Sequence, residues 1–293
     1  MPTRVFGRPV PAALVGAVAI AFSAILYRLA DVSPSTGAFW RCAYAVPPLL
    51  LLAWWEDRRI GPRLWRTRVW AWLAGAFLAV DLVVWHQSIE YVGAGLATVL
   101  GNTQVLLVGV AAWLLFRERP SRAVTAAIPV AMGGVVLISG VLEEGAYGDD
   151  PELGVLFGLM TGVAYTGFLL ALRHGSSDLR RVAGPLCDAT LACALLIVPI
   201  GLALGDLDFT PPLSAHLWLL LLALSSQAFG WLLITVSLPR LPAAVTSVLL
   251  TLQPVCSVLF AAVLLGEDPS ALQLAGVAAI LGGLLLASFG RRG

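Results

Sequence analysis

Long apolar stretches, separated by short polar segments, make up most of this chain. Ten of them approach the ~20 residues that an α-helix needs to cross the hydrocarbon core of a bilayer. They run approximately over residues 12–29, 36–55, 69–89, 93–116, 121–142, 152–172, 182–203, 214–237, 241–265 and 269–290. Because the connecting segments are short, the pattern predicts an all-α membrane protein with ten transmembrane helices and no separate extramembrane domain.

Two parts of the chain match each other without a gap. Residues 97–121 align with residues 246–270 at an offset of 149 residues. The informative matches are three polar residues, a proline and two glycines: Gln104 with Gln253, Glu118 with Glu267, Pro120 with Pro269, Ser121 with Ser270, and the pair Gly133 and Gly134 with Gly282 and Gly283. We therefore predict two repeats, residues 1–145 and 146–293, that together form one membrane domain.

Each predicted repeat holds five spans, and because five is odd, the two repeats must insert with opposite orientations. Inverted repeats are typical of secondary transporters, whose substrate site lies near the bilayer midplane where the repeats meet. Simple gene duplication in a structural membrane protein is the alternative.

The composition agrees with the membrane prediction and narrows the partners. The chain has 293 residues, of which 59% are hydrophobic and 12% charged, and its mean hydropathy is +0.90. A net charge of +1 argues against a nucleic-acid partner, which would require a concentrated basic face. All four cysteines lie in apolar runs, and no metal-binding, nucleotide-binding or hydrolase motif is present. We expect a non-enzymatic protein without cofactor or metal, whose partners are the lipid bilayer, a small-molecule substrate and, with proton coupling, protons.

The arginines predict the orientation of the chain. If the N-terminus is cytoplasmic, 16 of the 18 basic residues, all arginines, fall on the cytoplasmic side, while most acidic residues, including Glu267, fall in the outer loops. The positive-inside rule counts basic residues in short loops and favours this orientation. We expect a multi-pass protein of the plasma (inner) membrane with both termini cytoplasmic.

The second repeat resembles a known transporter family. Gln253-Pro254-Val255, then Leu265-Gly266-Glu267, then Gly282-Gly283 are similar to the EamA repeat of the drug/metabolite transporter superfamily. The first repeat departs from that pattern at Val105, where proline is usual, and at Arg117, where glycine is usual. The resemblance covers the chain from residue 12 to residue 290. It implies a ten-helix transporter of two inverted halves around a central cavity, which moves small metabolites or amino-acid-like solutes, outward by analogy with the family.

Asp81, midway along the third span, is our first candidate for a functional side chain, because an ionisable residue inside a span is costly and by default marks a pathway, a proton relay or a structural pair. Trp85 shares its helix face one turn on, and an aromatic ring beside a carboxylate could hold a cationic group. Arg41 in the second span could reach Asp81. A buried salt bridge between the two is the structural alternative to a role in substrate binding or proton coupling.

Two other charged residues receive structural interpretations. His86 is turned away from Asp81 around the helix, so we expect it at the membrane interface rather than in a proton relay. Asp188 in the seventh span is expected to extend toward Arg180 and Arg181, with a role at an inner gate as the alternative.

Neutral polar residues near the middle of spans 4 and 9 are candidates for lining a cavity. Gln104 and Gln253 form a symmetric pair in the repeats, and Asn102 and Thr251 accompany them. Interhelical hydrogen bonding is the structural alternative for these side chains. Tyr165 in span 6 completes the cavity candidates. Pro254 is the hinge candidate in span 9, because proline removes a helical hydrogen bond.

Small residues mark two helix faces suited to close packing. Gly154, Gly158 and Gly162 share a face of span 6, and Ala275, Ala279 and Gly283 share a face of span 10. The face on span 10 could pack within the chain or form a homodimer. For the chain as a whole we expect a secondary transporter. The alternatives are a facilitator without ion coupling and a membrane-embedded enzyme or lipid-handling protein.

Overall fold

The computed structural model of the protein describes residues 9–107, 110–111, 122–176, 178, 180–237 and 243–289, with the side chains of residues 9, 243–251, 288 and 289 excepted. Every regular element in these ranges is a helix. They are α1 (Pro9–Ala21), α2 (Ser23–Ala30), α3 (Pro34–Ile60), α4 (Trp65–Val92), α5 (Ala94–Gly101), α7 (Arg122–Ile138), α8 (Pro151–Gly175), α9 (Ala183–Leu204), α10 (Leu213–Leu222), the π-helical η1 (Ala223–Gly230), α11 (Trp231–Ser237), α12 (Ala243–Phe260), the π-helical η3 (Ala261–Leu265) and α13 (Ala271–Phe289). The all-helical expectation is confirmed for these residues.

Five of the predicted spans correspond to helical segments long and apolar enough to cross a membrane. They are Val10–Ala30, Trp65–Val92, Pro151–Gly175, Ala183–Leu204 and Leu213–Ser237. Four more correspond to shorter apolar helices at Ala94–Leu107, Arg122–Ile138, Leu252–Leu265 and Ala271–Ala287. The remaining run, 36–55, lies within the 27-residue helix α3. Its hydropathy is lowered by Arg41, Pro47 and Pro48. The total of ten spans therefore stays a prediction.

The chain divides by its contacts into two units. Unit 1 consists of Met1–His86 and Gly167–Leu241, and unit 2 consists of Gln87–Thr166 and Pro242–Gly293. Each unit combines segments from both predicted repeats, and α4 and α8 contribute residues to both units. The predicted boundary at residues 145 and 146 therefore concerns the repeats and stays a prediction from the sequence.

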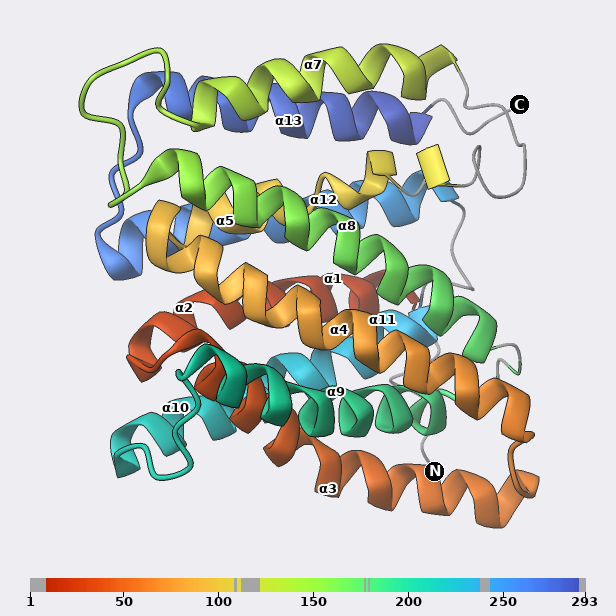
Figure 1. Ribbon diagram of the computed structural model, residues 1–293. Coiled ribbons are helices and arrows are strands. Elements are labelled where there is room, and N and C mark those ends of the chain that lie inside the picture. The colour runs from red at the N-terminus through yellow and green to blue at the C-terminus, as the bar shows by residue number, and fades with distance from the viewer. Residues whose placement is uncertain are drawn as a thin grey trace. The chain divides into compact units, whose positions relative to one another are not determined.

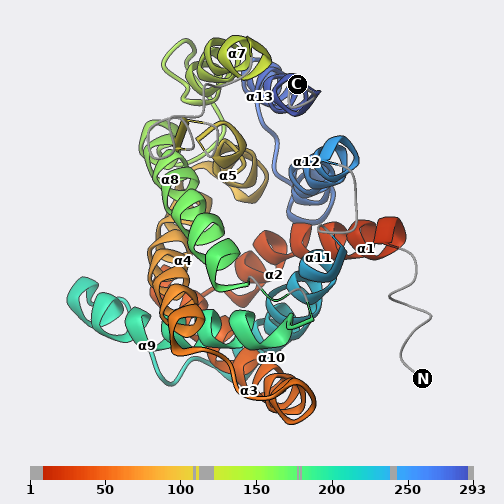
Figure 2. The same ribbon diagram turned by 90° about the vertical axis from the view of Figure 1, so that its right-hand side faces the viewer.

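In unit 1, α3 and α9 lie side by side, and they are the second spans of the two predicted repeats (Figures 1 and 2). Each helix ends near the start of the other. Glu56, late in α3, accepts hydrogen bonds from the backbone N–H groups of residues 182–184 at 2.8–2.9 Å, and Asp206, just after α9, accepts one from the Ser35 N–H at 3.2 Å. The helices are therefore antiparallel, and each N-terminus has a carboxylate where the helix dipole favours one.

In unit 2, α7 and α13 lie side by side, and they are the fifth spans of the repeats (Figure 1). Close glycine contacts define their register. A Cβ atom on Gly134 would lie 2.6 Å from the Gly276 carbonyl oxygen, and one on Gly283 would lie 3.2 Å from the Ala127 carbonyl oxygen. An offset of 149 residues converts the first contact into the second. The pair is antiparallel, which is what an inverted repeat requires of equivalent spans.

Both predicted small-residue faces take part in packing within unit 2. A Cβ atom on Gly158 would lie 2.6 Å from the Leu100 side chain, and one on Gly162 would lie 2.7 Å from the Thr103 hydroxyl. On α13, Ala279 and Gly283 face α7. This face of span 10 therefore packs within the chain and is not available as a dimer interface. A homodimer stays a prediction, but this face no longer supports it.

Candidate functional site

Three carboxylates are buried among the residues that the structure describes: Asp81, Asp188 and Glu267, with 7%, 4% and 5% of their surface exposed. A buried carboxylate is costly unless ion pairs or hydrogen bonds compensate for its lost hydration. The partners of each therefore indicate whether it serves the fold or remains available for chemistry.

Asp81 lies on α4, within unit 1. Its Oδ1 atom has no hydrogen-bond partner among the described residues, and the ion pairs found there do not include Asp81. Arg41 on α3 is 3% exposed, and its guanidinium carbon lies 5.7 Å from the ring centroid of Trp85. Its positive charge also acts on the Asp81 carboxyl across the cluster. The structure thus brings Asp81, Trp85 and Arg41 together without the direct salt bridge that was the structural alternative.

The expectation for His86 is wrong in part. The side chain is fully buried rather than interfacial, and its ring stacks on Tyr27 with centroids 3.8 Å apart and an interplanar angle of 1°. Its Nδ1 atom is 3.0 Å from the Pro34 carbonyl oxygen. A Cβ atom on Gly37 would lie 2.6 Å from the Tyr27 ring, so glycine leaves room for the stacked pair. The helical periodicity correctly placed His86 on a different face of the helix from Asp81. It could not predict the contact with Tyr27, because Tyr27 lies on α2, a segment distant in the sequence.

The expectation for Asp188 is wrong as well. Its two carboxylate oxygens accept hydrogen bonds from Arg63 at 2.8 and 3.1 Å, and Oδ2 accepts a third from Arg68 at 3.2 Å. The arginines that were expected to bind it have other partners. The loop between α3 and α4 carries Arg63 to the start of α9, and this tertiary contact replaces the local one between Asp188 and Arg180 or Arg181.

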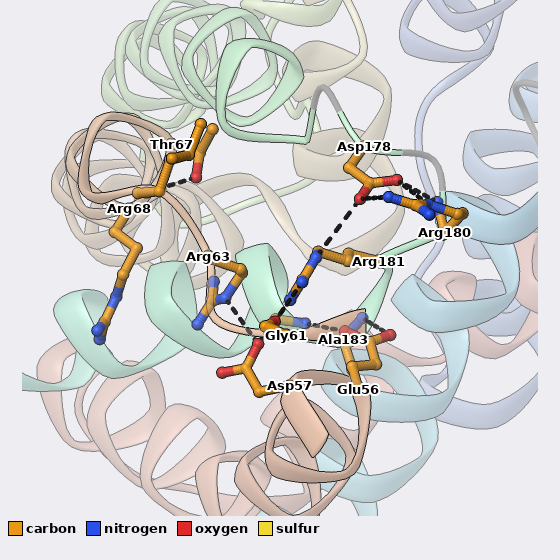
Figure 3. Close-up of polar contacts among 12 residues, drawn as sticks. Glu56, Asp57, Gly61, Arg63, Thr67, Arg68, Asp178, Arg180, Arg181 and Ala183 are labelled. Atoms are coloured by element: carbon orange, nitrogen blue, oxygen red, sulfur yellow. Dashed lines mark hydrogen bonds and ion pairs between the residues drawn. The ribbon is translucent and has the colours of Figure 1, made fainter. Parts of the chain in front are cut away.

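Arg181 and Arg180 belong to a polar network at the same end of unit 1 (Figure 3). Arg181 donates to Asp57 at 2.6 Å and to the Gly61 carbonyl oxygen. Arg180 donates to Asp178 at 2.9 Å, and this guanidinium lowers the pKa of the Asp178 carboxyl to about 2. The network links the loop after α3 to the loop before α9, two segments that are far apart in the sequence.

A cavity of about 270 Å³ lies beside this network, lined in part by Arg63, Thr67, Arg180 and Arg181. Each of its three arginines forms an ion pair: Arg63 with Asp188, Arg181 with Asp57, and Arg180 with Asp178. Because these charges are already matched, the cavity carries little unpaired positive charge for an anionic ligand.

Glu267, expected in an outer loop, is buried at the N-terminus of α5. It accepts hydrogen bonds from the backbone N–H groups of Ala94 at 2.6 Å and Gly95 at 3.1 Å. Helix N-termini favour negative charge because their first N–H groups have no partner within the helix. Its match with Glu118 in the first repeat singled out Glu267 in the sequence. That match did not predict that Glu267 would bind the N-terminus of α5. Glu118 itself lies outside the described residues.

The helix of span 4 is interrupted at its polar stretch. Asn102 and Thr103 form a turn after α5, where the N–H groups of Thr103, Val105 and Leu106 donate to carbonyls three residues earlier. The Asn102 side chain donates to the Thr98 carbonyl at 2.8 Å. Polar side chains that bond nearby backbone compete with regular helix, which accounts for the break.

Span 9 joins span 4 close to this break. The Ser257 hydroxyl on α12 donates to the Thr98 hydroxyl at 3.0 Å. This is the interhelical hydrogen bonding that was the structural alternative for the polar residues of these spans. It involves Ser257 rather than the residues expected from the repeat.

The remaining candidates are placed as follows. Gln104 is buried and Gln253 is half-buried, and neither amide hydrogen-bonds to the other among the described residues. Pro254 lies inside α12, and Tyr165 is half-buried on α8. The side chain of Thr251 lies outside the described residues. Their roles as cavity and hinge residues stay predictions.

One polar segment escaped the sequence analysis. Residues 223–230 form the π-helical segment η1, which includes Ser226 and Gln227. Ser226 donates to the Ala19 carbonyl at 2.6 Å, and Gln227 donates to the Thr190 hydroxyl at 3.3 Å while its Oε1 atom has no partner among the described residues. Short π-helical segments recur at functional sites. The sequence could have indicated this segment, because two serines and a glutamine interrupt an apolar run there.

No three His, Cys, Asp or Glu side chains gather as they would around a metal ion in the part of the chain that the structure describes. The expectation that the protein needs neither metal nor cofactor stays a prediction.

Comparison with protein families identifies the chain. A family model described as "EamA-like transporter family" matches residues 8–140 and again residues 152–289. The chain belongs to the EamA-like transporter family. The resemblance drawn from the second repeat is thereby confirmed, and both halves carry the family's repeat. Membership makes the chain a multi-pass membrane protein of the drug/metabolite transporter class, whose members are transporters rather than enzymes.

Solved structures support the fold alone. Twenty-two chains match. One of them, described only as "Crystal structure of protein", has a TM-score of 0.63 and 18% sequence identity, and the match covers 97% of this chain and 100% of that one. A comparison with curated proteins found no match.

Proposed function

We propose that this EamA-like protein moves a small organic solute across the inner membrane by alternating access, and that Asp81 couples the movement to protons. The observation that carries the proposal is the contrast among the three buried carboxylates. Asp188 has two arginines and Glu267 has two backbone N–H groups, whereas the Asp81 Oδ1 atom has no hydrogen-bond partner among the described residues. A buried carboxylate without direct compensation is suited to exchange a proton or to bind a cationic group.

The neighbours of Asp81 support an amino-acid-like substrate. Such a molecule carries an ammonium and a carboxylate, and the cluster offers a carboxylate at Asp81 and a guanidinium at Arg41. The Trp85 ring adds an aromatic face beside the guanidinium. The ammonium of a zwitterion would face Asp81 and its carboxylate would face Arg41, and both attractions are stronger in a weakly polar region than in water.

Irregular backbone supports the transport mechanism. Span 4 is interrupted at Asn102 and Thr103, and span 8 contains the π-helical segment η1. Membrane spans tolerate such backbone where it is buried in protein or lines a water-filled cavity, and broken helices form the substrate sites of many secondary transporters.

The test is the melting temperature of the detergent-purified protein with amino acids, amines, carboxylates and nucleosides, each at two pH values. A ligand present at a hundred times its Kd adds roughly 2.7 kcal/mol of stability if it binds only the folded state. We expect amino acids to raise the melting temperature, and Asp81→Asn to abolish the rise. Asp149→Asn is the matched control, because Asp149 is exposed, and it should keep the rise.

Flux measurements then test the coupling. The solute that raises the melting temperature is followed into proteoliposomes with and without a pH gradient, and we expect wild-type flux to follow the gradient. If folded Asp81→Asn protein carries the solute at the wild-type rate with unchanged pH dependence, the role of Asp81 is wrong. A flux that ignores pH in the wild type identifies an uncoupled facilitator instead. Reporter fusions after residue 292 test the cytoplasmic location of the C-terminus.

A further inference from the structure

The end of α3 and the start of α4 concentrate tryptophan and arginine. Five of the ten tryptophans lie within residues 54–72, together with five arginines. They are Trp54, Trp55, Trp65, Trp70 and Trp72, and Arg58, Arg59, Arg63, Arg66 and Arg68. Trp70, Trp72 and Arg68 are also exposed, and Arg68 is paired with Asp188. We give the name Trp/Arg surface to six other exposed members of the group: Trp54, Trp55, Arg58, Arg59, Trp65 and Arg66.

The tryptophans of this surface are unusually accessible for such large apolar side chains. Trp54 is 51% exposed, Trp55 is 43% exposed and Trp65 is 71% exposed. Leu51, one turn before Trp55, is 64% exposed, so apolar side chains continue along α3 away from the arginines. Tryptophan prefers the boundary between hydrocarbon and headgroups, because its ring is apolar and its N–H is polar. The change from leucine to tryptophan to arginine along α3 therefore matches the depth profile of a bilayer leaflet.

Two arginines of the surface lie over tryptophan rings. The guanidinium carbon of Arg58 is 4.5 Å from the ring centroid of Trp54, and that of Arg59 is 3.4 Å from the centroid of Trp55. Both pairs have the spacing of one helical turn, at which side chains on a helix meet. These cation–π contacts hold the charges at the level of the rings while leaving the arginine N–H groups free of carboxylates.

The carboxylates at this end of unit 1 are already engaged (Figure 3). Glu56 binds the N-terminus of α9, and Asp57 binds Arg181. Asp178 binds Arg180, and Asp188 binds Arg63 and Arg68.

None of the ion pairs found among the described residues includes Arg58, Arg59 or Arg66. The surface therefore carries positive charge that no ion pair among the described residues neutralises. This distinguishes it from the neighbouring 270 Å³ cavity, whose arginines are paired.

We propose that the Trp/Arg surface is a binding site for anionic phospholipid, in which Arg58, Arg59 and Arg66 contact the headgroup phosphate and the tryptophans and leucines contact the upper acyl chains. Each basic residue close to an anionic leaflet contributes about a fivefold increase in binding. The site is separate from the transport cluster around Asp81, so that failure of either proposal leaves the other standing.

Quenching of tryptophan fluorescence by brominated lipid tests the proposal directly, because half of the tryptophans lie in this stretch. The full-length protein in neutral detergent micelles is titrated with phosphatidylglycerol or phosphatidylcholine, each brominated in the acyl chain near the headgroup. We expect phosphatidylglycerol to quench at much lower concentration. Glycerol phosphate, which has the charge but no acyl chains, should not displace it, because the site takes the lipid rather than a free phosphate.

Variants then locate the site. The triple variant Arg58→Gln, Arg59→Gln, Arg66→Gln should lose most of the preference for phosphatidylglycerol, about fivefold per arginine. Arg180→Gln is the matched control, because Arg180 is also exposed at this end of the unit but is paired with Asp178, and it should retain the preference. Equal quenching by the two lipids in the wild type, or an unchanged preference in the triple variant, would overturn the proposal.

A salt titration keeps the test independent of how well the triple variant folds. In the wild type, raising the ionic strength from about 0.05 to 0.5 M should weaken quenching by phosphatidylglycerol and leave quenching by phosphatidylcholine unchanged, because salt screens exposed charges. A preference that does not respond to salt would mean that the arginines do not supply it, and the proposal would fail.

Discussion

Two adjacent glycines on α7 offer a controlled test of how the fifth spans pack. Gly134 faces α13, and a Cβ atom there would lie 2.6 Å from the Gly276 carbonyl oxygen and 2.8 Å from an Ile280 side-chain carbon. Gly133, one residue earlier on the same helix, has nothing within 4 Å of its Cβ position. An alanine at either position lies in the same helix. The two alanines therefore differ only in their contacts with α13.

The magnitude follows from two opposing effects. Alanine is about 1 kcal/mol more favourable than glycine inside a helix, so Gly133→Ala should stabilise the protein by roughly that amount. Gly134→Ala gains the same amount but must displace backbone, and overpacking of this kind costs about 1–3 kcal/mol. Because the helix preference cancels, the difference between the two variants should be about 1–3 kcal/mol, with Gly134→Ala the less stable.

The repeat supplies a second pair with a smaller expected difference. Gly282 is open like Gly133, whereas a Cβ atom on Gly283 would lie 3.2 Å from the Ala127 carbonyl oxygen. That contact is tight but not prohibitive, so we expect Gly283→Ala to lie less than about 1 kcal/mol below Gly282→Ala.

The assay is thermal unfolding of all four alanine variants in one detergent, followed by intrinsic fluorescence. The expected order of melting temperatures places Gly133→Ala and Gly282→Ala highest, Gly283→Ala below them and Gly134→Ala lowest. A difference of about 2–4 °C accompanies each kcal/mol in proteins of 150–250 residues. If Gly134→Ala melts at or above Gly133→Ala, the close approach of α7 and α13 is wrong.

Two further predictions concern the polar contacts of unit 1. Glu56→Gln places an amide NH2 group against one of the three N–H groups at the start of α9, which should lower the free energy of unfolding by about 1–3 kcal/mol. Glu152→Gln, at an exposed site, should change that free energy by no more than about 0.5 kcal/mol. Equal effects would contradict the role of Glu56 in capping α9. Asp178 has its folded-state pKa lowered from 3.8 to about 2 by Arg180, so its stabilising effect is present above pH 3.8 and is lost as the pH falls through about 2. The difference in melting temperature between Asp178→Asn and the wild type should therefore be constant from pH 4 to 8 and shrink only in stronger acid, and a change near neutral pH would refute this.

The helical architecture was predictable because the bilayer imposes a length and a polarity on each span. The repeat was predictable in part because its matched glycines make equivalent contacts. The glycine pairs show why, since Gly134 and Gly283 face a partner helix while Gly133 and Gly282 do not. A conserved geometry at two places in one fold leaves a mark in the sequence, even without a second protein for comparison.

Partners across the fold were less predictable. Asp188 was expected to bind arginines nearby in the sequence and instead binds Arg63, which is 125 residues away. His86 was expected at the interface and instead stacks on Tyr27. Periodicity predicts the helix on which a residue lies and the face that it occupies. It does not predict which distant loop or helix packs against that residue.

Glu267 shows how the sequence repeat and the tertiary contacts complement each other. The repeat marked it as important, and the structure shows that it holds the N-terminus of α5. Glu267 and Asp188 both have partners that match their negative charge. Asp81 is the remaining buried carboxylate among the described residues, and its Oδ1 atom has no such partner there. Burying a carboxyl oxygen without a hydrogen-bond partner is costly, so stability alone does not account for an aspartate here. The presence of aspartate at this position, beside Trp85 and Arg41, is therefore the strongest physical argument that transport depends on residue 81.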